Sequence, residues 1–122
     1  MAAVLLIDDE LGIQTLVQRI LVRLGHDVTC AGSGEEAMTC ARAHVYDLIL
    51  SDYTLPGEPS GLELLKELRA LQPASQMAVL TGLADTARMD ALREADIQHL
   101  LQKPFDVNQL RTLVNALLPP ST

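Results

Sequence analysis

Short apolar runs alternate along the chain with longer segments in which apolar residues recur every three or four positions. A continuous apolar run predicts a strand buried on both faces, and the wider spacing predicts a helix with one buried face. Five such pairs follow one another, with strands expected over Val4–Ile7, Val28–Ala31, Leu48–Ser51, Met77–Leu80 and Ile97–Leu101.

Capping and helix-breaking residues mark the ends of the predicted helices. Gly25 stops the first helix and Pro73 the third, because glycine favours the position after a helix and proline cannot continue one. Ser33–Glu36 and Ser60–Glu63 match the Ser-x-x-Glu capping box. The fourth helix can begin at Asp85, and Asp106 can cap the fifth, whose inner face carries Val107, Leu110, Leu113, Val114 and Leu117.

This alternation predicts the α/β class, a (βα)5 doubly wound sandwich around a five-stranded parallel sheet. The 122 residues have the length of one domain. Ligands of doubly wound sheets bind at the carboxyl ends of the strands. The residues that follow each strand are therefore the first candidates for chemistry.

Charge and aromatic content argue against nucleic-acid binding. The net charge is −7 at pH 7, whereas binding to nucleic acids depends on Lys and Arg that neutralise phosphates. The aromatic residues are Tyr46, Tyr53 and Phe105, too few to indicate stacking on bases. We expect no direct contact between this chain and nucleic acid.

The N-terminal segment and the cysteines predict a cytoplasmic location. Ala2–Ile7 is too short for a membrane span and lacks the basic flank of a signal peptide. Cys30 and Cys40 have no metal-ligand spacing and are expected to be free thiols in a reducing compartment. The histidines are also scattered and are expected at the surface or in loops.

Acidic, hydroxyl and basic residues follow the predicted strands. Asp8 and Asp9 follow the first strand, Asp52 follows the third, Thr81 the fourth and Lys103 the fifth. Clustered carboxylates require a cation or altered protonation. Because all the ligand atoms would be oxygens, Mg²⁺ is the favoured ion and Mn²⁺ is also compatible.

These residue types suit the transfer of a phosphoryl group. A carboxylate can accept a phosphoryl group to form an aspartyl phosphate, which makes Asp52 the candidate nucleophile. Each residue also has an ordinary alternative role: Asp8 or Asp9 could cap the first helix, Thr81 could bond within a loop, and Lys103 could be solvated. Their expected convergence at one edge favours the functional interpretation.

Four segments in order, VLLIDDE, LILSDYTLPG, VLTG and QKPF, resemble the receiver domain of two-component response regulators and hybrid histidine kinases. The resemblance implies a CheY-like receiver over residues 1–118, with flavodoxin-like strand order 2-1-3-4-5, and a tail or linker start over 119–122. The chain would be a single-domain regulator or, as LLPPST suggests, a receiver excised from a larger protein.

The resemblance implies a signalling module, whose chemistry is limited to Mg²⁺-dependent self-phosphorylation and slow autodephosphorylation. Asp52 would be the phosphoacceptor, taking its phosphoryl group from the phosphohistidine of a sensor histidine kinase or a histidine phosphotransfer domain. Asp8, Asp9, Asp52 and the backbone carbonyl of Thr54 would hold Mg²⁺.

The resemblance also implies a conformational switch. Thr81 would move to bond the phosphoryl group, Lys103 would pair with it, and the Lys103–Pro104 peptide would be cis. The change would reach the face formed by the fourth helix, fifth strand and fifth helix, where partners or a second copy of the chain would dock.

Three positions depart from the family pattern. Leu100 replaces the usual aromatic switch residue, which puts the aromatic part of the switch in doubt. Asp96 replaces a glycine and can adopt the left-handed conformation that the turn requires. Gly61 lies one residue later than usual, which predicts one extra residue around Glu58–Ser60, a surface insertion beside the metal site.

Two other function classes stay open. An aspartate-nucleophile phosphatase also uses Mg²⁺ on a doubly wound sheet, but such enzymes carry Asp-x-Asp after the first strand. A pseudo-receiver would dock partners without being phosphorylated. The intact set of Asp8, Asp9, Asp52, Thr81 and Lys103 argues against a pseudo-receiver, and Leu100 argues slightly for it.

Overall fold

The structure, a computed structural model, describes residues 2–82, 86–97 and 99–118. Five parallel strands form one sheet in the order β2-β1-β3-β4-β5, which confirms the predicted flavodoxin-like arrangement. The strands are β1 (Ala3–Ile7), β2 (Asp27–Ala31), β3 (Leu48–Asp52), β4 (Gln76–Thr81) and β5 (His99–Gln102).

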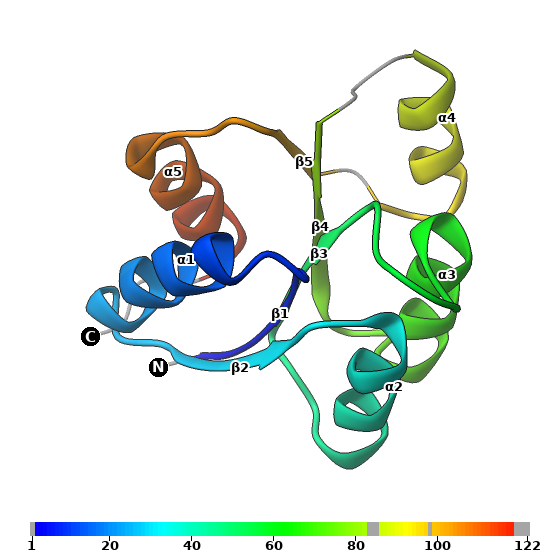
Figure 1. Ribbon diagram of the computed structural model, residues 1–122, viewed down its shortest axis with the longest axis horizontal. Coiled ribbons are helices and arrows are strands. Elements are labelled where there is room, and N and C mark those ends of the chain that lie inside the picture. Colours follow the sequence, from blue (N-terminus) through cyan, green and yellow to red (C-terminus); the bar gives the residue numbers. More distant parts are fainter. Residues whose placement is uncertain (1, 83–85, 98, 119–122) are drawn as a thin grey trace.

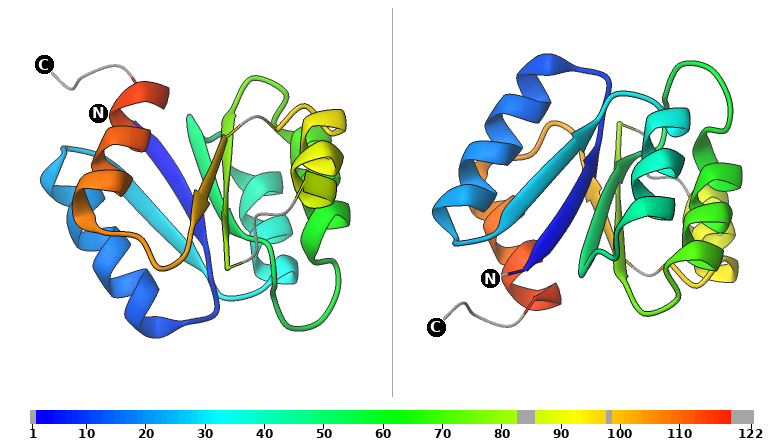
Figure 2. Two further views of the ribbon diagram at one scale, coloured as in Figure 1. Left: turned by 90° about the horizontal axis from the view of Figure 1, so that it is seen from above. Right: turned by 90° about the horizontal axis from the view of Figure 1, so that it is seen from below.

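Helices cover both faces of this sheet (Figure 1). On one face lie α1 (Leu11–Arg23) and α5 (Val107–Leu117), and on the other lie α2 (Gly34–Ala43), α3 (Gly61–Leu71) and α4 (Thr86–Glu94). Figure 2 shows the same three layers from above and below. The chain is therefore the doubly wound sandwich that the hydrophobic pattern predicts.

The central strands contribute side chains to two separate cores. Leu5 and Ile7 pack with the residues of α2, α3 and α4, whereas Val4 and Leu6 pack with those of α1 and α5. Alternate residues of a strand point to opposite faces, and all four side chains are fully buried. This burial on both faces explains why the strands read as continuous apolar runs.

Some predicted boundaries and burial states are wrong. The fifth strand begins at His99 and not at Ile97, whose side chain is buried although it precedes the strand. Val107, expected on the inner face of α5, is the first residue of that helix and is 38% exposed. His26 lies in the loop between α1 and β2, which agrees with the expectation of a surface or loop position, but it is buried there; its Nδ1 accepts a hydrogen bond from the Ala2 amide at 3.2 Å.

The helix caps agree only in part with the predictions. The Ser33 side chain accepts from the Glu36 amide at 3.2 Å, but the Glu36 carboxylate accepts from the Gly32 amide, one residue earlier than in a capping box. Ser60 is the N-cap of α3 and makes no side-chain capping bond, so the second predicted box is absent. Asp106 caps α5, as predicted, and the structure shows that Gln109 completes a capping box there.

Several smaller predictions have clear outcomes. Cys30 and Cys40 are free thiols. Asp96 adopts a φ of 63°, the left-handed conformation expected where the family has glycine. Within residues 2–82, 86–97 and 99–118, no helix has the length and apolar character needed to cross a membrane. The predicted helix start at Asp85 and the predicted tail over 119–122 lie outside the described residues.

Candidate functional site

The parallel register brings the carboxyl ends of several strands to one edge of the sheet. Asp52, the last residue of β3, pairs with Leu80, which directly precedes Thr81 in β4. The Lys103 amide, just after β5, donates to the Thr81 carbonyl at 2.7 Å. Asp8 follows β1, the other neighbour of β3, so residues far apart in the sequence meet at this edge.

The Lys103 ammonium lies at the centre of the site. Its Nζ is 2.9 Å from Asp8 Oδ2, 3.1 Å from Asp52 Oδ2 and 3.3 Å from Glu10 Oε1. Burial opposes the charged form of Lys103, but the hydrogen bonds to Asp8 and Asp52 outweigh it and raise the lysine pKa above its ordinary value. Lys103 is therefore a permanent cation among carboxylates.

Asp52 is a buried carboxyl with competing influences on its charge. Burial raises the pKa of Asp52, while the Thr54 amide and the Lys103 ammonium oppose that rise. The Thr54 amide donates to Asp52 Oδ1 at 3.2 Å, and Lys103 contacts Oδ2. The two oxygens of the carboxylate are thus held in a defined orientation at the end of β3.

Three carboxylates form a group that fits a hard divalent cation. Oxygens of Asp8, Glu10 and Asp52 lie within 4.8 Å of one another, and carboxylate oxygens are the ligands that Mg²⁺ prefers. Asp9 is exposed and is not a member of this group. Neither Asp8 nor Asp9 caps α1, whose N-cap is Glu10.

Glu10 is a site residue that sequence reasoning missed. It follows the acidic pair directly in VLLIDDE, so the local excess of acids was the available signal. Its backbone amide donates to Asp8 Oδ1 at 2.9 Å, and this turn directs the glutamate toward Lys103. The functional prediction stopped at the acidic pair, since the first carboxylates after a strand are the usual candidates.

Thr81 is almost completely buried and contacts an arginine from α4. Arg88 Nη1 donates to Thr81 Oγ1 at 2.9 Å, and Arg88 Cζ lies 4.0 Å from the ring centroid of Tyr53. Sequence reasoning also missed Arg88. The helix that carries it has a weak apolar pattern, and no local motif indicates that its arginine points to the site.

The loop after Asp52 packs against neighbouring elements. Gly61 has a φ of 57°, and a Cβ at this position would lie 3.5 Å from the Tyr53 ring. The Pro59 carbonyl approaches Gly34 so closely that a Cβ on that glycine would be 1.8 Å away. This loop is therefore held against the start of α2. Both Glu58–Pro59 and Lys103–Pro104 are cis.

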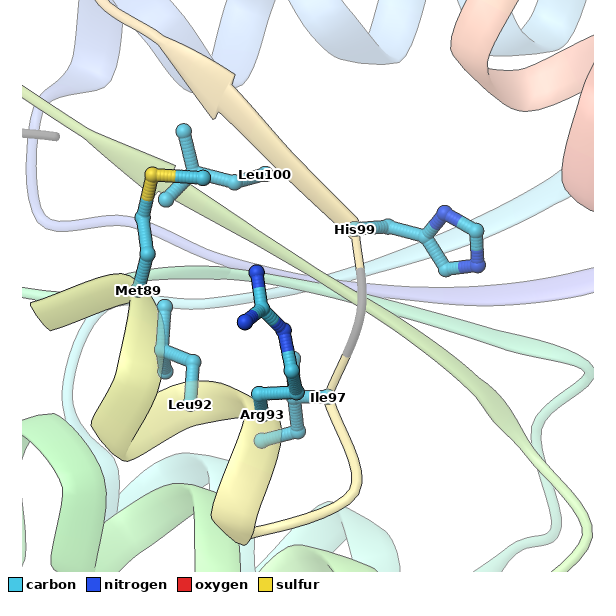
Figure 3. Close-up of a pocket in the computed structure, with 6 residues that line it drawn as sticks. All are labelled: Met89, Leu92, Arg93, Ile97, His99 and Leu100. Atoms are coloured by element: carbon cyan, nitrogen blue, oxygen red, sulfur yellow. The ribbon is translucent and has the colours of Figure 1, made fainter. Parts of the chain in front are cut away.

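Leu100 lines a pocket of about 400 Å³ between α4 and β5. Figure 3 shows Leu100 and Met89 extending toward the same space, whereas the His99 ring points away from the other five side chains. Leu92 and Ile97 form part of the pocket lining, and both are buried. Leu100 is aliphatic, so position 100 contributes no aromatic ring to this pocket.

The fold and this edge define a class of protein: a doubly wound parallel sheet with a buried aspartate, an acidic group and a lysine at the carboxyl ends of its strands. Residues 4–115 match the family of the response regulator receiver domain. The chain belongs to that family. This membership confirms the resemblance carried by the four sequence segments.

Sequence relatives support the assignment. The chain is 34% identical over 116 residues to the transcriptional regulatory protein ZraR of Escherichia coli K12; the match covers 93% of the chain but 26% of ZraR. The chain therefore spans about a quarter of that relative's length.

Solved structures give the same result. The chemotaxis protein CheY4 of Vibrio cholerae superposes with a TM-score of 0.89 at 28% identity, covering 97% of this chain and 99% of the other. A response regulator from Burkholderia pseudomallei, solved with a phosphorylated aspartic acid and a calcium ion, has a TM-score of 0.85 at 32% identity, with 98% and 68% covered.

Proposed function

We propose that this chain is a phosphoacceptor in a two-component phosphorelay, and that Asp52 takes the phosphoryl group. The observation that carries the proposal is the 3.1 Å contact between Asp52 Oδ2 and Lys103 Nζ within the acidic group. A fixed cation beside a carboxylate can neutralise the charge that develops on a phosphoryl oxygen. The phosphorylated aspartic acid in the Burkholderia relative supports the same chemistry.

The donor is the phosphohistidine of a sensor histidine kinase or of a histidine phosphotransfer domain. An oxygen of Asp52 forms the new bond to phosphorus as the phosphorus–nitrogen bond breaks, and the electron pair of that bond returns to the partner's imidazole. The Lys103 ammonium pairs with the Asp52 carboxylate before the transfer and with the phosphoryl oxygens after it. The Thr81 hydroxyl donates a hydrogen bond to one of these oxygens.

Mg²⁺ is the proposed metal, and it supplies positive charge for the transfer when bound. Asp8 and Asp52 are the best placed ligands, with Glu10 completing the carboxylate group that the structure describes. Asp9 and the backbone carbonyl of Thr54 remain predicted ligands from the family pattern. Mn²⁺ has similar oxygen preferences and is the expected substitute.

Phosphorylation is proposed to alter docking at the face formed by α4, β5 and α5. The added group brings about −1.5 to −2 charges and three strong acceptors to the edge beside these elements. Partners or a second copy of the chain would bind this face, and the pocket at Leu100 is its concave part. The equilibrium between two conformations would shift, as in other phosphorylation switches.

The test is phosphorylation by a small donor. The protein is incubated with Mg²⁺ and acetyl phosphate, and adducts are followed by intact-mass spectrometry; we expect one labile phosphoryl group that is absent in Asp52→Asn. Asp27→Asn is the matched control, since Asp27 is exposed at the first position of β2. Absence of any adduct would favour a pseudo-receiver, and rapid turnover of many phosphate esters a phosphatase.

A further inference from the structure

Arg88 joins α4 to the ends of two strands beside the phosphoacceptor. Its Nη1 donates to Thr81 Oγ1 at 2.9 Å, and its Cζ lies 4.0 Å above the Tyr53 ring. Tyr53 follows Asp52 directly in the chain, and its amide donates to the Leu80 carbonyl at 2.9 Å. The Arg88 guanidinium therefore contacts one residue just after β3 and the last residue of β4, beside the place where the phosphoryl group would form.

The hydroxyl chemistry of Thr81 allows this contact to persist during signalling. A hydroxyl donates one hydrogen bond and accepts two. The Arg88 N–H uses an acceptor position of Thr81 Oγ1, so it does not compete with donation by Thr81 to a phosphoryl oxygen. Hydrogen bonds in a chain polarise one another, so the two bonds strengthen each other.

The charge at the site also favours a further cation, because Mg²⁺ offsets only the charge present before phosphorylation and the phosphoryl group then adds more negative charge. Three carboxylates surround one ammonium, which leaves a formal charge of −2 before any phosphoryl group is added (−3 from Asp8, Glu10 and Asp52, +1 from Lys103). A guanidinium is a planar donor of five N–H groups that suits phosphoryl oxygens. The Arg88 guanidinium lies over the ring of Tyr53, the residue that follows Asp52 in the chain.

We propose that Arg88 is a positioning residue that couples Thr81 to α4, so that phosphorylation at Asp52 displaces this helix. The inference rests on the proposed function. When Thr81 moves to the phosphoryl group, Arg88 moves with it, and α4 is drawn toward the site. In this chain the coupling runs through an arginine of α4, whereas Leu100 of β5 has neither a ring nor a hydroxyl to provide it.

The next residue of α4 links this movement to the outer surface. Met89 follows Arg88 and lines the pocket that also contains Leu100 (Figure 3). A displacement of Arg88 toward the site therefore changes the shape of this pocket. Thr81 is thereby connected to the docking face through two consecutive residues of α4, Arg88 and Met89.

The experiment compares four proteins by amide NMR during titration with beryllofluoride, a phosphoryl analogue, in the presence of Mg²⁺. The proteins are the wild type, Arg88→Ala, Arg88→Lys and Arg93→Ala. Arg93 is the matched control, because it is on the same helix and pairs instead with Asp90 at 3.6 Å. Circular dichroism before titration verifies that each variant is folded.

In the wild type and in Arg93→Ala, we expect amide shifts both at the site, near Asp52 and Lys103, and in α4. In Arg88→Ala the site should still respond while the α4 shifts are largely lost. Affinity for beryllofluoride should fall about three- to tenfold, the effect of one hydrogen bond of ordinary net strength. Arg88→Lys should lie between the two, since it keeps the charge without the fork of donors.

A double-mutant cycle with Thr81→Ala separates coupling from simple structural support. If Arg88 acts through Thr81, then Arg88→Ala should change affinity less than about twofold when Thr81 is already alanine. Full α4 shifts in Arg88→Ala would overturn the inference. A wild type that does not respond to beryllofluoride at all would instead contradict the proposed phosphoacceptor function, so the two failures are distinguishable.

Discussion

Replacement of Lys103 by methionine removes the cation at the centre of the acidic group while preserving much of the side-chain volume. At an effective dielectric constant of about 20, its contacts at 2.9 Å with Asp8 and 3.1 Å with Asp52 each correspond to about 5–6 kcal/mol of gross attraction. The pair with Glu10 counts for little, because that side chain is 61% exposed and solvent screens it.

The net loss is smaller than these gross values, because the site can respond by binding a proton. Protonation of one carboxyl with an ordinary pKa of about 3.9 costs about 4 kcal/mol at pH 7. We therefore expect the free energy of unfolding of Lys103→Met to fall by about 3–4 kcal/mol, within the range for breaking a buried ion pair. Because Asp8 is fully buried, water cannot take the place of Lys103 in solvating its carboxylate.

The pH dependence follows from this proton. The folded variant binds a proton near pH 7 that its unfolded chain does not, so its stability falls as the pH rises. The deficit should therefore shrink by about 1.4 kcal/mol per pH unit between pH 7 and pH 5. Mg²⁺ at one hundred times its dissociation constant should stabilise whichever protein binds it by about 2.7 kcal/mol, so measurements without Mg²⁺ isolate the effect of Lys103.

The assay is urea unfolding followed by circular dichroism at pH 7 and pH 5, with and without Mg²⁺. Lys66→Met is the matched control, since Lys66 is exposed on α3; its stability should change by less than about 0.5 kcal/mol. The electrostatic account would be refuted if Lys103→Met were as stable as Lys66→Met at pH 7 without Mg²⁺.

Three further changes test other parts of the structure by urea unfolding. Because burial raises the pKa of Asp52, the native state binds its proton more tightly than the unfolded chain, and stability falls as the pH rises through that titration. Asp52→Asn should therefore be more stable than the wild type at pH 7 and should lose this advantage below about pH 4; a constant difference would argue against the explanation. Ser33→Ala should cost about 1 kcal/mol and Ser60→Ala less than about 0.5 kcal/mol, since only Ser33 makes a capping bond; equal losses would contradict the assignment. Gly34→Ala should cost at least about 2 kcal/mol, because its Cβ would lie 1.8 Å from the carbonyl of the loop after β3, whereas Gly12→Ala in open space should be stabilising by about 0.5–1 kcal/mol.

The strands and the fold class could be predicted because their signal is local. Residues Leu48–Asp52 of β3 are all buried, and a strand buried on both faces must be apolar over its whole length except where function requires a charge. The same reasoning wrongly placed Ile97 in a strand. Ile97 is apolar because its side chain is buried, but the residue precedes β5, so burial did not indicate strand pairing there. Local patterns report burial more directly than they report hydrogen bonding.

The capping residues show a second limit of local patterns. Ser60–Glu63 has the residue types of a capping box, yet Ser60 makes no capping bond. Gly61 at the start of this helix has a positive φ, with the Tyr53 ring 3.5 Å from the position of its Cβ. Packing of the loop after β3 decides the geometry there, and a four-residue pattern cannot include it.

The order of residues along the chain was sufficient to predict a doubly wound sheet and an acidic edge containing Asp8 and Asp52. Both follow from strand periodicity and from the rule that the carboxyl ends of parallel strands meet at one edge. The contacts that organise the site depend on longer distances in the chain: Lys103 and Asp8 are 95 residues apart. Only the folded chain shows that Glu10 joins the acidic group, that Asp9 stays exposed and that Arg88 reaches Thr81. Those outcomes depend on register and side-chain direction, which the packing of several elements together decides.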